Sequence, residues 1–273
     1  MTHSLDLADC LRVAVEAAHI GASILESWRS KFHVREKARA DLVTEADVAS
    51  QVAVRSHLLA AFPDHGFVGE EDAVGKTIEE TRPALDAAPT WVVDPLDGTV
   101  NYVHDVPCYC VSIGLYVSGR PVVGVIYDPR MKELFTAAEG HGAFLNGVPM
   151  RVSSVAMLSD GLLSTGFPAN FDAQMRNWDA WVKMTSAAQA LRRSGSTALN
   201  MAYIACGRFD GYWAYDNYAW DVMAGAILIR EAGGTVTGIR GDAYDPFRMD
   251  VIASNGTVHG EIVDVLNAVA PRS

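Results

Sequence analysis

The sequence predicts an α/β fold in which helices and β-sheets are stacked in layers. An alanine-rich segment over 7–28 has apolar residues at helical spacing, whereas 111–144 contains short β-prone runs separated by turn residues. After Pro149, helical and strand-like segments alternate as far as the C-terminus. Because helices that alternate with strands pack on the faces of sheets, these three observations indicate a layered α/β sandwich.

Each half of the chain has its own expected order of elements. In the first half these are a helix over 7–28, a helix from a capping box at Thr44 and Asp47 to Phe62, a strand over 67–68, a surface excursion over 79–89, a buried strand ending at 91–93, and an antiparallel meander over 111–117, 122–127 and 133–137. In the second half they are a helix over 172–189, a strand into 194–195, a helix over 197–206, a strand over 211–215, a helix over 220–232, a strand over 251–253 and a terminal helix from 258.

Composition narrows the class of protein. A chain of 273 residues with 49% hydrophobic and 20% charged residues is typical of a soluble globular protein, as one large domain or two packed halves. The net charge of −11 opposes binding to a polynucleotide, so no nucleic-acid partner is expected. No signal-peptide pattern and no run of 18 apolar residues is present, which favours a cytoplasmic protein that does not enter a membrane.

The segment 91–104 is the most informative part of the chain. Its apolar start indicates the end of a buried strand, which places Asp94 at the C-terminal edge of a sheet, where ligands tend to bind. A proline and a glycine then force a turn that brings Asp97 back to the same point. Two carboxylates in a stiff turn suit Mg²⁺, and the backbone N–H groups of Gly98 and Thr99 could donate to a phosphate. The alternative interpretation is an ordinary acidic turn after a strand.

Segment 91–104 closely resembles the first signature of the inositol monophosphatase family of magnesium-dependent, lithium-sensitive phosphatases. Three further segments resemble family motifs in the same order, namely Asp41–Asp47, Gly69-Glu70-Glu71 and Trp220–Gly234. The resemblance implies an αβαβα sandwich with mixed and antiparallel sheets. It also implies that 1–150 hold most metal ligands, that 151–273 complete the cleft of one compact unit, and that the protein is a homodimer.

The resemblance also implies roles for individual residues. One Mg²⁺ would be held by Glu70, Asp94 and the Leu96 carbonyl and would lower the pKa of the attacking water; a second, held by Asp94, Asp97 and Asp221, would stabilise the leaving alkoxide. Two or three Mg²⁺ ions are expected per site. Asp47, Glu70 and Thr99 would serve catalysis, with Asp47 and Thr99 helping to deprotonate the water. The substrate would be bound by Gly98, Thr99, Gly195, Ser196, Thr197 and position 214.

Taken singly, two of these residues have simpler explanations. Asp47 and Asp221 could each be an acid at the start of a helix that interacts with the helix dipole. The histidines have no zinc-ligand spacing, and the serines have no nucleophile elbow, so neither zinc chemistry nor a serine nucleophile is expected.

The substrate is where the chain departs from the family pattern. Ala214 occupies the position at which inositol-specific members carry a glutamate that binds inositol hydroxyls. The expected activity is hydrolysis of inositol monophosphate or a similar small polyol or sugar phosphate, with Asp216 or the aromatics at 212, 213, 215 and 218 as substitute contacts. Two alternatives remain open. One is a histidinol-phosphate, fructose-1,6-bisphosphate, nucleotide 3'-phosphate or NADP phosphatase of the same superfamily, and the other is a noncatalytic regulatory protein.

Overall fold

The structure is a computed structural model, which describes residues 5–29, 31, 33–38, 41–167 and 171–269. The helices within these residues are α1 (Leu7–Trp28), α2 (Glu45–Ala61), α3 (Ile78–Thr81), α4 (Thr99–Val103), α5 (Phe171–Ala187), α6 (Thr197–Ala205), α7 (Ala219–Glu231), α8 (His259–Asn267) and the 3₁₀ turns η1 (Glu70–Asp72) and η2 (Leu158–Asp160). The strands are β1 (Val34–Ala38), β2 (Asp41–Thr44), β3 (Gly66–Gly69), β4 (Thr90–Asp97), β5 (Cys110–Val117), β6 (Arg120–Asp128), β7 (Glu133–Ala138), β8 (Gly142–Leu145), β9 (Val148–Pro149), β10 (Leu162–Thr165), β11 (Ala190–Arg192), β12 (Gly211–Ala214), β13 (Thr235–Thr237) and β14 (Val251–Ser254).

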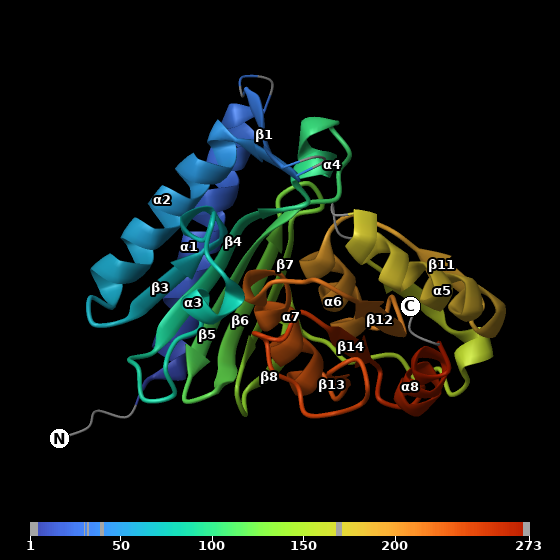
Figure 1. Ribbon diagram of the computed structural model, residues 1–273. Coiled ribbons are helices and arrows are strands. Elements are labelled where there is room, and N and C mark those ends of the chain that lie inside the picture. Colours follow the sequence, from blue (N-terminus) through green and yellow to red (C-terminus); the bar gives the residue numbers. More distant parts are fainter. Residues whose placement is uncertain (1–4, 30, 32, 39–40, 168–170, 270–273) are drawn as a thin grey trace.

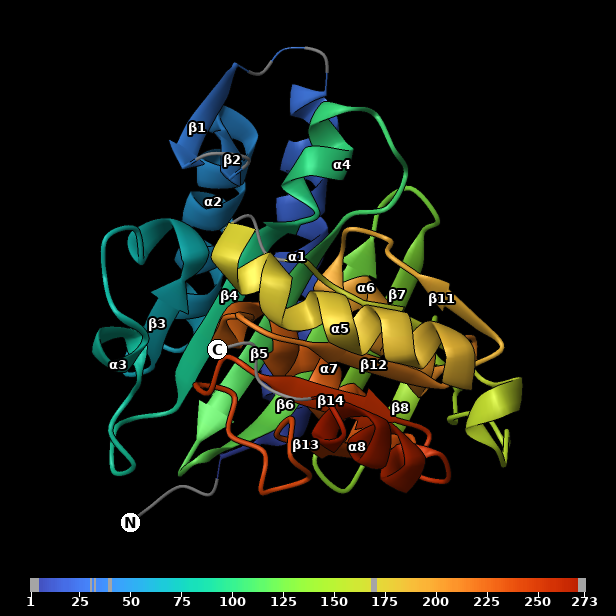
Figure 2. The same cartoon turned by 45° about the vertical axis from the view of Figure 1, so that its right-hand side comes forward.

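The elements form five layers, as the sequence predicted. Figure 1 shows these layers from α1 and α2 on the left, through the larger sheet and the α6–α7 layer, to the smaller sheet with α5 and α8 on the right. In Figure 2, α5 and α8 lie in front of the smaller sheet and cover its outer face. The prediction of an αβαβα sandwich is confirmed.

The two sheets differ in how their strands pair. Within the described residues the larger sheet has the order β3-β4-β5-β6-β7-β8-β9, with only the β3–β4 pair parallel. The smaller sheet has the order β11-β10-β12-β14-β13 and mixes parallel and antiparallel pairs. The larger sheet therefore contains the predicted antiparallel meander, as β5, β6 and β7.

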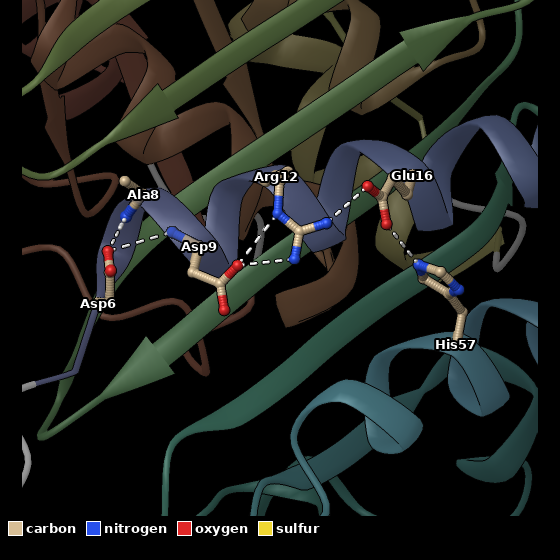
Figure 3. Close-up of polar contacts among 6 residues, drawn as sticks. All are labelled: Asp6, Ala8, Asp9, Arg12, Glu16 and His57. Atoms are coloured by element: carbon tan, nitrogen blue, oxygen red, sulfur yellow. Dashed lines mark hydrogen bonds and ion pairs between the residues drawn. The ribbon is translucent and has the colours of Figure 1, made fainter.

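The side chain of Asp6 caps the N-terminus of the outer helix α1. Asp6 accepts hydrogen bonds from the backbone N–H groups of Ala8 and Asp9, and Figure 3 shows Arg12 lying between Asp9 and Glu16 on the exposed side of α1. The buried side consists largely of small residues, alanine above all, which lets α2 pack closely. A Cβ atom at Gly21 would lie 2.8 Å from Val54 of α2, so the helix crossing depends on that glycine.

The capping box predicted at the start of α2 is present. The Thr44 hydroxyl accepts from the backbone of Ala46, and the Asp47 carboxylate accepts from the backbone N–H of Thr44 at 2.9 Å. This reciprocal pair satisfies backbone donors at the helix start and fixes where α2 begins.

The middle layer explains why its helix α7 is apolar on nearly every side. One side of α7 packs on the larger sheet, where a Cβ atom at Gly124 of β6 would lie 2.4 Å from Ile227. The other side faces α6, where a Cβ at Gly225 would lie 2.5 Å from Met201. A helix enclosed between two sheets has no solvent-facing stripe, so its sequence carries few polar residues.

Three sequence expectations need correction. Strand β4 does not end before the acidic turn, because its pairing with β5 continues to Asp97 across a β-bulge between Asp94 and Asp97. The excursion over 79–89 includes the end of the short helix α3, which was not predicted. The strand expected at 194–195 lies earlier in the chain, as β11.

Five further strand regions were missed, namely the β1–β2 hairpin, β8, β9, β10 and β13. All of these strands are five residues or shorter, which is too short for a periodic pattern to be recognised.

Of the described helices, none combines the length and the apolar character needed to cross a membrane.

Candidate active site

A cluster of acidic side chains lies where β4 ends and α7 begins. The register pairs Asp94 of β4 with Ser112 of β5, and the Ser112 hydroxyl donates to the Trp220 carbonyl at 3.2 Å. This contact holds the first residues of α7 beside the β-bulge, and so brings Asp221 to Asp94 although 126 residues separate them in the chain. The predicted acids from three separate motifs therefore meet in one place.

Asp94 is the most strongly perturbed member of the cluster. Its side chain is only 2% exposed, and Oδ1 accepts from the backbone N–H of Leu96 at 2.9 Å. Burial raises the pKa of Asp94 well above its usual value, and the charges of Glu70, Asp97 and Asp221 raise it further. Because each of these acids raises the pKa of Asp94, the cluster favours a bound cation over a set of ionised carboxylates.

Asp97 is held by the start of α6. Its Oδ2 accepts from the Ser196 hydroxyl at 2.5 Å and from the backbone N–H of Ala198 at 2.7 Å, while Oδ1 accepts from the N–H of Thr197 at 3.2 Å. Burial raises the pKa of Asp97 to about 6, and these hydrogen bonds oppose the rise because they stabilise the ionised form. The predicted Ser196 and Thr197 thus belong to the site, but in this structure they contact an acid directly.

Asp221 and Glu70 complete the cluster. The Asp221 carboxylate accepts from the backbone N–H of Tyr218 at 2.8 Å. Burial raises the pKa of Asp221 well above its usual value, and the charges of Asp97 and Glu70 raise it further. A hydrogen bond with the Asp94 carboxyl lowers this pKa and so opposes the rise. Glu70 lies at the first position of η1, after the buried end of β3, and its charge acts on all the buried acids of the site.

Asp47 caps α2 and also contacts the Thr99 hydroxyl. It closes the capping box of α2, and its Oδ1 also accepts from the Thr99 hydroxyl at 3.2 Å. Burial raises the pKa of Asp47 to about 6, with hydrogen bonds from Thr44 opposing the rise and the charge of Glu70 adding to it. The Thr99 hydroxyl also lies 3.1 Å from the Leu96 carbonyl, so the candidate base, hydroxyl and ligand carbonyl are adjacent.

Glycines shape two loops that lie next to the acid cluster. Gly98 has φ +97° at the N-terminal end of α4, and a Cβ atom there would lie 2.8 Å from the Cys108 carbonyl oxygen. Gly195 has φ +86° just before α6, and a Cβ atom there would lie 2.9 Å from the Asn101 amide. Both positions therefore require glycine for conformation and for space.

The donor set fits a hard divalent cation in its chemistry. Glu70, Asp94, Asp97 and Asp221 offer only oxygen, which Mg²⁺ prefers. In the part of the chain that the structure describes, however, no three His, Cys, Asp or Glu side chains are arranged as a ready-made metal site. Oxygens of Asp97 and Asp221 are instead hydrogen-bonded to the protein. Metal binding would have to exchange some of these bonds for ligation.

The residues predicted to contact the substrate differ in how far they are buried. Ala214, Tyr212 and Trp213 are fully buried, and the Trp213 indole donates to the Asn177 side chain at 2.6 Å, so the indole is part of the core. Tyr218 is 42% exposed and stacks on Trp220, with ring centroids 4.7 Å apart and an 8° angle between the planes.

Sequence reasoning missed two residues that contact the site. Cys110 lies 3.8 Å from Asp97, and Asn101 joins α4 to the loop before α6. The sequence pattern does not show these contacts, because Asp97 lies 13 residues from Cys110 and Ser194 lies 93 residues from Asn101.

The chain is similar to known proteins over nearly its whole length. The sequence pattern of the inositol monophosphatase family matches residues 6–270. Inositol monophosphatase 2 of Solanum lycopersicum is 42% identical over 262 residues, covering 93% of this chain and 97% of the relative. Nus factor SuhB of Pseudomonas aeruginosa is 40% identical over 272 residues, covering 96% and 97%. The solved structure of an inositol monophosphatase from Anabaena (Nostoc) sp. PCC 7120 superposes with a TM-score of 0.84 at 38% identity, covering 98% of each chain.

Proposed function

This chain belongs to the inositol monophosphatase family and is a phosphoric monoester hydrolase, and we propose that it uses Mg²⁺ to hydrolyse a small polyol or sugar phosphate. The observation that carries the proposal is the buried cluster of Asp94, Asp97 and Asp221, whose pKa values rise through burial and through the charges of neighbouring carboxylates, that of Glu70 among them. Such a cluster is costly to the fold unless cations neutralise it.

The proposed mechanism uses the residues of the chain as follows. Bound Mg²⁺ supplies charge neutralisation and lowers the pKa of water, which the slow hydrolysis of phosphate monoesters requires. Glu70, Asp94, the Leu96 carbonyl, Asp97 and Asp221 would provide its ligands. Asp47 accepts a hydrogen bond from the Thr99 hydroxyl, so this pair can orient an attacking water and receive its proton.

The phosphate would lie between the two glycine-shaped loops. The backbone at Gly98 and Thr99 forms one side, and Gly195, Ser196 and Thr197 form the other. In the structure, Asp97 accepts hydrogen bonds from the donors at the start of α6.

The substrate side of the site lacks an acceptor where inositol-specific members have glutamate. Ala214 offers only a buried methyl group, which cannot accept hydrogen bonds from polyol hydroxyls. Among the aromatics predicted as substitutes, Tyr218 is the most exposed, and it lies beside Asp221. We propose that inositol monophosphate is accepted without sharp preference, and that Tyr218 contacts the ring of cyclic substrates.

A substrate panel assayed by phosphate release with Mg²⁺ tests this proposal. We expect kcat/KM for inositol 1-phosphate to stay within about a hundredfold of the other small phosphates, because the charged hydrogen bond at position 214 is absent. Tyr218→Ala should lower kcat/KM for cyclic esters by about two- to tenfold and leave glycerol 2-phosphate unchanged. Trp178→Ala, at an aromatic that is 51% exposed on α5, is the matched control. A preference for inositol 1-phosphate above a hundredfold would contradict the proposal.

Lithium should inhibit the enzyme in an uncompetitive or mixed manner at millimolar concentrations. A monovalent ion bound by Asp97 and Asp221 would leave the product phosphate trapped in the site. Initial rates at several substrate and Li⁺ concentrations measure this, with K⁺ as the control ion. Full activity at about 100 mM Li⁺, well above common KM values, would indicate a different second site.

The other properties that we propose rest on the family resemblance and the sequence. They are a homodimeric state, a cytoplasmic location and the absence of a nucleic-acid partner. The SuhB relative is named a Nus factor. The complete acid set of this chain favours catalysis over the alternative of a purely regulatory protein, and turnover with a generic phosphomonoester decides between them.

A further inference from the structure

Asn101 joins two segments that form opposite sides of the proposed phosphate site. It lies on α4, two residues after Thr99, and its side-chain amide donates to two backbone carbonyls. One is the Cys108 carbonyl at 2.7 Å, in the segment that packs against Gly98; the other is the Ser194 carbonyl at 2.8 Å, just before Gly195. Both amide hydrogens are therefore used to connect parts of the chain that are distant in sequence.

Gly195 fits against this amide. A Cβ atom at position 195 would lie 2.9 Å from Nδ2 and 3.1 Å from Oδ1 of Asn101, and the backbone has φ +86°. The Asn101 amide therefore fills the space that a side chain at 195 would need. A side chain at position 195 would therefore collide with the amide, and only glycine fits there with Asn101 in place.

The loop that Asn101 holds leads directly into the donors that contact Asp97. Ser196 caps α6 by accepting from the N–H of Leu199, and its hydroxyl donates to Asp97. The backbone N–H groups of Thr197 and Ala198 donate to the same carboxylate. A shift of the Ser194 carbonyl would therefore move all three donors relative to the bulge of β4.

We propose that Asn101 is a positioning residue for phosphate binding, which sets the distance between the Gly98–Thr99 backbone and the start of α6. It acts through the two loops and does not itself contact the substrate. The inference rests on the proposed phosphate site, and it adds a determinant outside the acid cluster. Loss of the Asn101 side chain should weaken binding of the phosphate group more than it slows the chemical step.

The first test compares Asn101→Asp and Asn101→Ala with the wild-type holoenzyme in Mg²⁺. Asn101→Asp keeps the shape but directs an acceptor at two carbonyls, and Asn101→Ala removes both hydrogen bonds without adding charge. We expect KM for the substrate and the calorimetric Kd for inorganic phosphate each to rise by about tenfold, with a smaller change in kcat.

Asn255→Asp is the matched control. The Asn255 amide also bridges two loop segments, donating to the Ser153 hydroxyl at 3.0 Å and the Val155 carbonyl at 2.9 Å, next to the smaller sheet. The Asn255→Asp variant should have a lower melting temperature and unchanged values of KM and of the phosphate Kd. This control separates a general loss of stability from a change in the phosphate site.

A double-mutant cycle tests the contact with Gly195. Gly195→Ala should raise the phosphate Kd in the wild-type background, and should raise it by a clearly smaller factor in Asn101→Ala, because the clash with the amide is gone. Folded Asn101 variants whose KM and phosphate Kd stay within twofold of wild type would overturn the inference, as would additive effects in the cycle. Failure of the proposed function would appear differently, as a wild-type enzyme that releases no phosphate from any substrate.

Discussion

Asp94→Asn should reduce kcat by at least about a thousandfold, because a neutral amide cannot replace the carboxylate that we expect both cations to share. The substitution keeps the size of a buried side chain and the acceptor for the Leu96 N–H. It also removes one of several charges that repel each other, so the metal-free variant should melt no lower than the metal-free wild type. Phosphate release and thermal melting measure the two effects.

Two further variants serve as comparisons for Asp94→Asn. Asp128→Asn is the matched control, because Asp128 is also fully buried at the end of a strand of the same sheet, and burial raises its pKa to about 6, yet it is not among the predicted ligands. It should keep kcat near that of the wild type. Asp221→Asn should mainly raise the Mg²⁺ concentration for half-maximal rate. If Asp94→Asn retains more than about a tenth of wild-type kcat, a barrier change under about 1.4 kcal/mol, the shared-ligand role is wrong.

The stabilisation by Mg²⁺ should increase with pH. Burial raises the pKa of Asp97 to about 6 from an ordinary value of 3.8, and it also raises the pKa of Asp94 and of Asp221 well above that ordinary value. A carboxyl whose pKa is higher in the folded state stabilises the fold below its unfolded pKa, and this stabilisation is lost as pH rises through the folded pKa. The metal-free protein should therefore lose stability as pH rises from about 4 through about 6 and above, and Mg²⁺ should restore it.

The measurement is the difference in melting temperature between Mg²⁺ and EDTA at about pH 5.5 and pH 7.5. We expect this difference to be larger at the higher pH by about 5 °C or more. Burial lowers the pKa of His65 and His259, which destabilises the fold as pH falls below 6.5. That contribution is common to both conditions and cancels in the difference. A difference that is equal or larger at the lower pH would show that the acids of the site do not bind the cation.

The sequence by itself predicted the fold class, most of the longer elements and the acids that the fold brings together. Periodic apolar residues marked α1 and the meander, and the Thr44–Asp47 pair marked the start of α2, because these signals depend only on residues close together in the chain. The motif around Asp94 also indicates a metal and phosphate site from its own residues, since the strand, the turn and both acids are contiguous. Short strands such as β10 and β13 gave no comparable signal, because three or four residues do not establish a period.

Only the tertiary structure decided which groups contact one another. The Asp97 carboxylate meets the start of α6, Asn101 reaches Ser194, and the Ser112 hydroxyl holds Trp220, across separations of 93 to 108 residues. The same packing buries Tyr212 and Trp213 in the core and leaves Tyr218 exposed, although all three looked alike as candidate ring contacts. Sequence patterns report the local preferences of the backbone, whereas these contacts arise from the stacking of β4, α6 and α7, which depends on the whole chain.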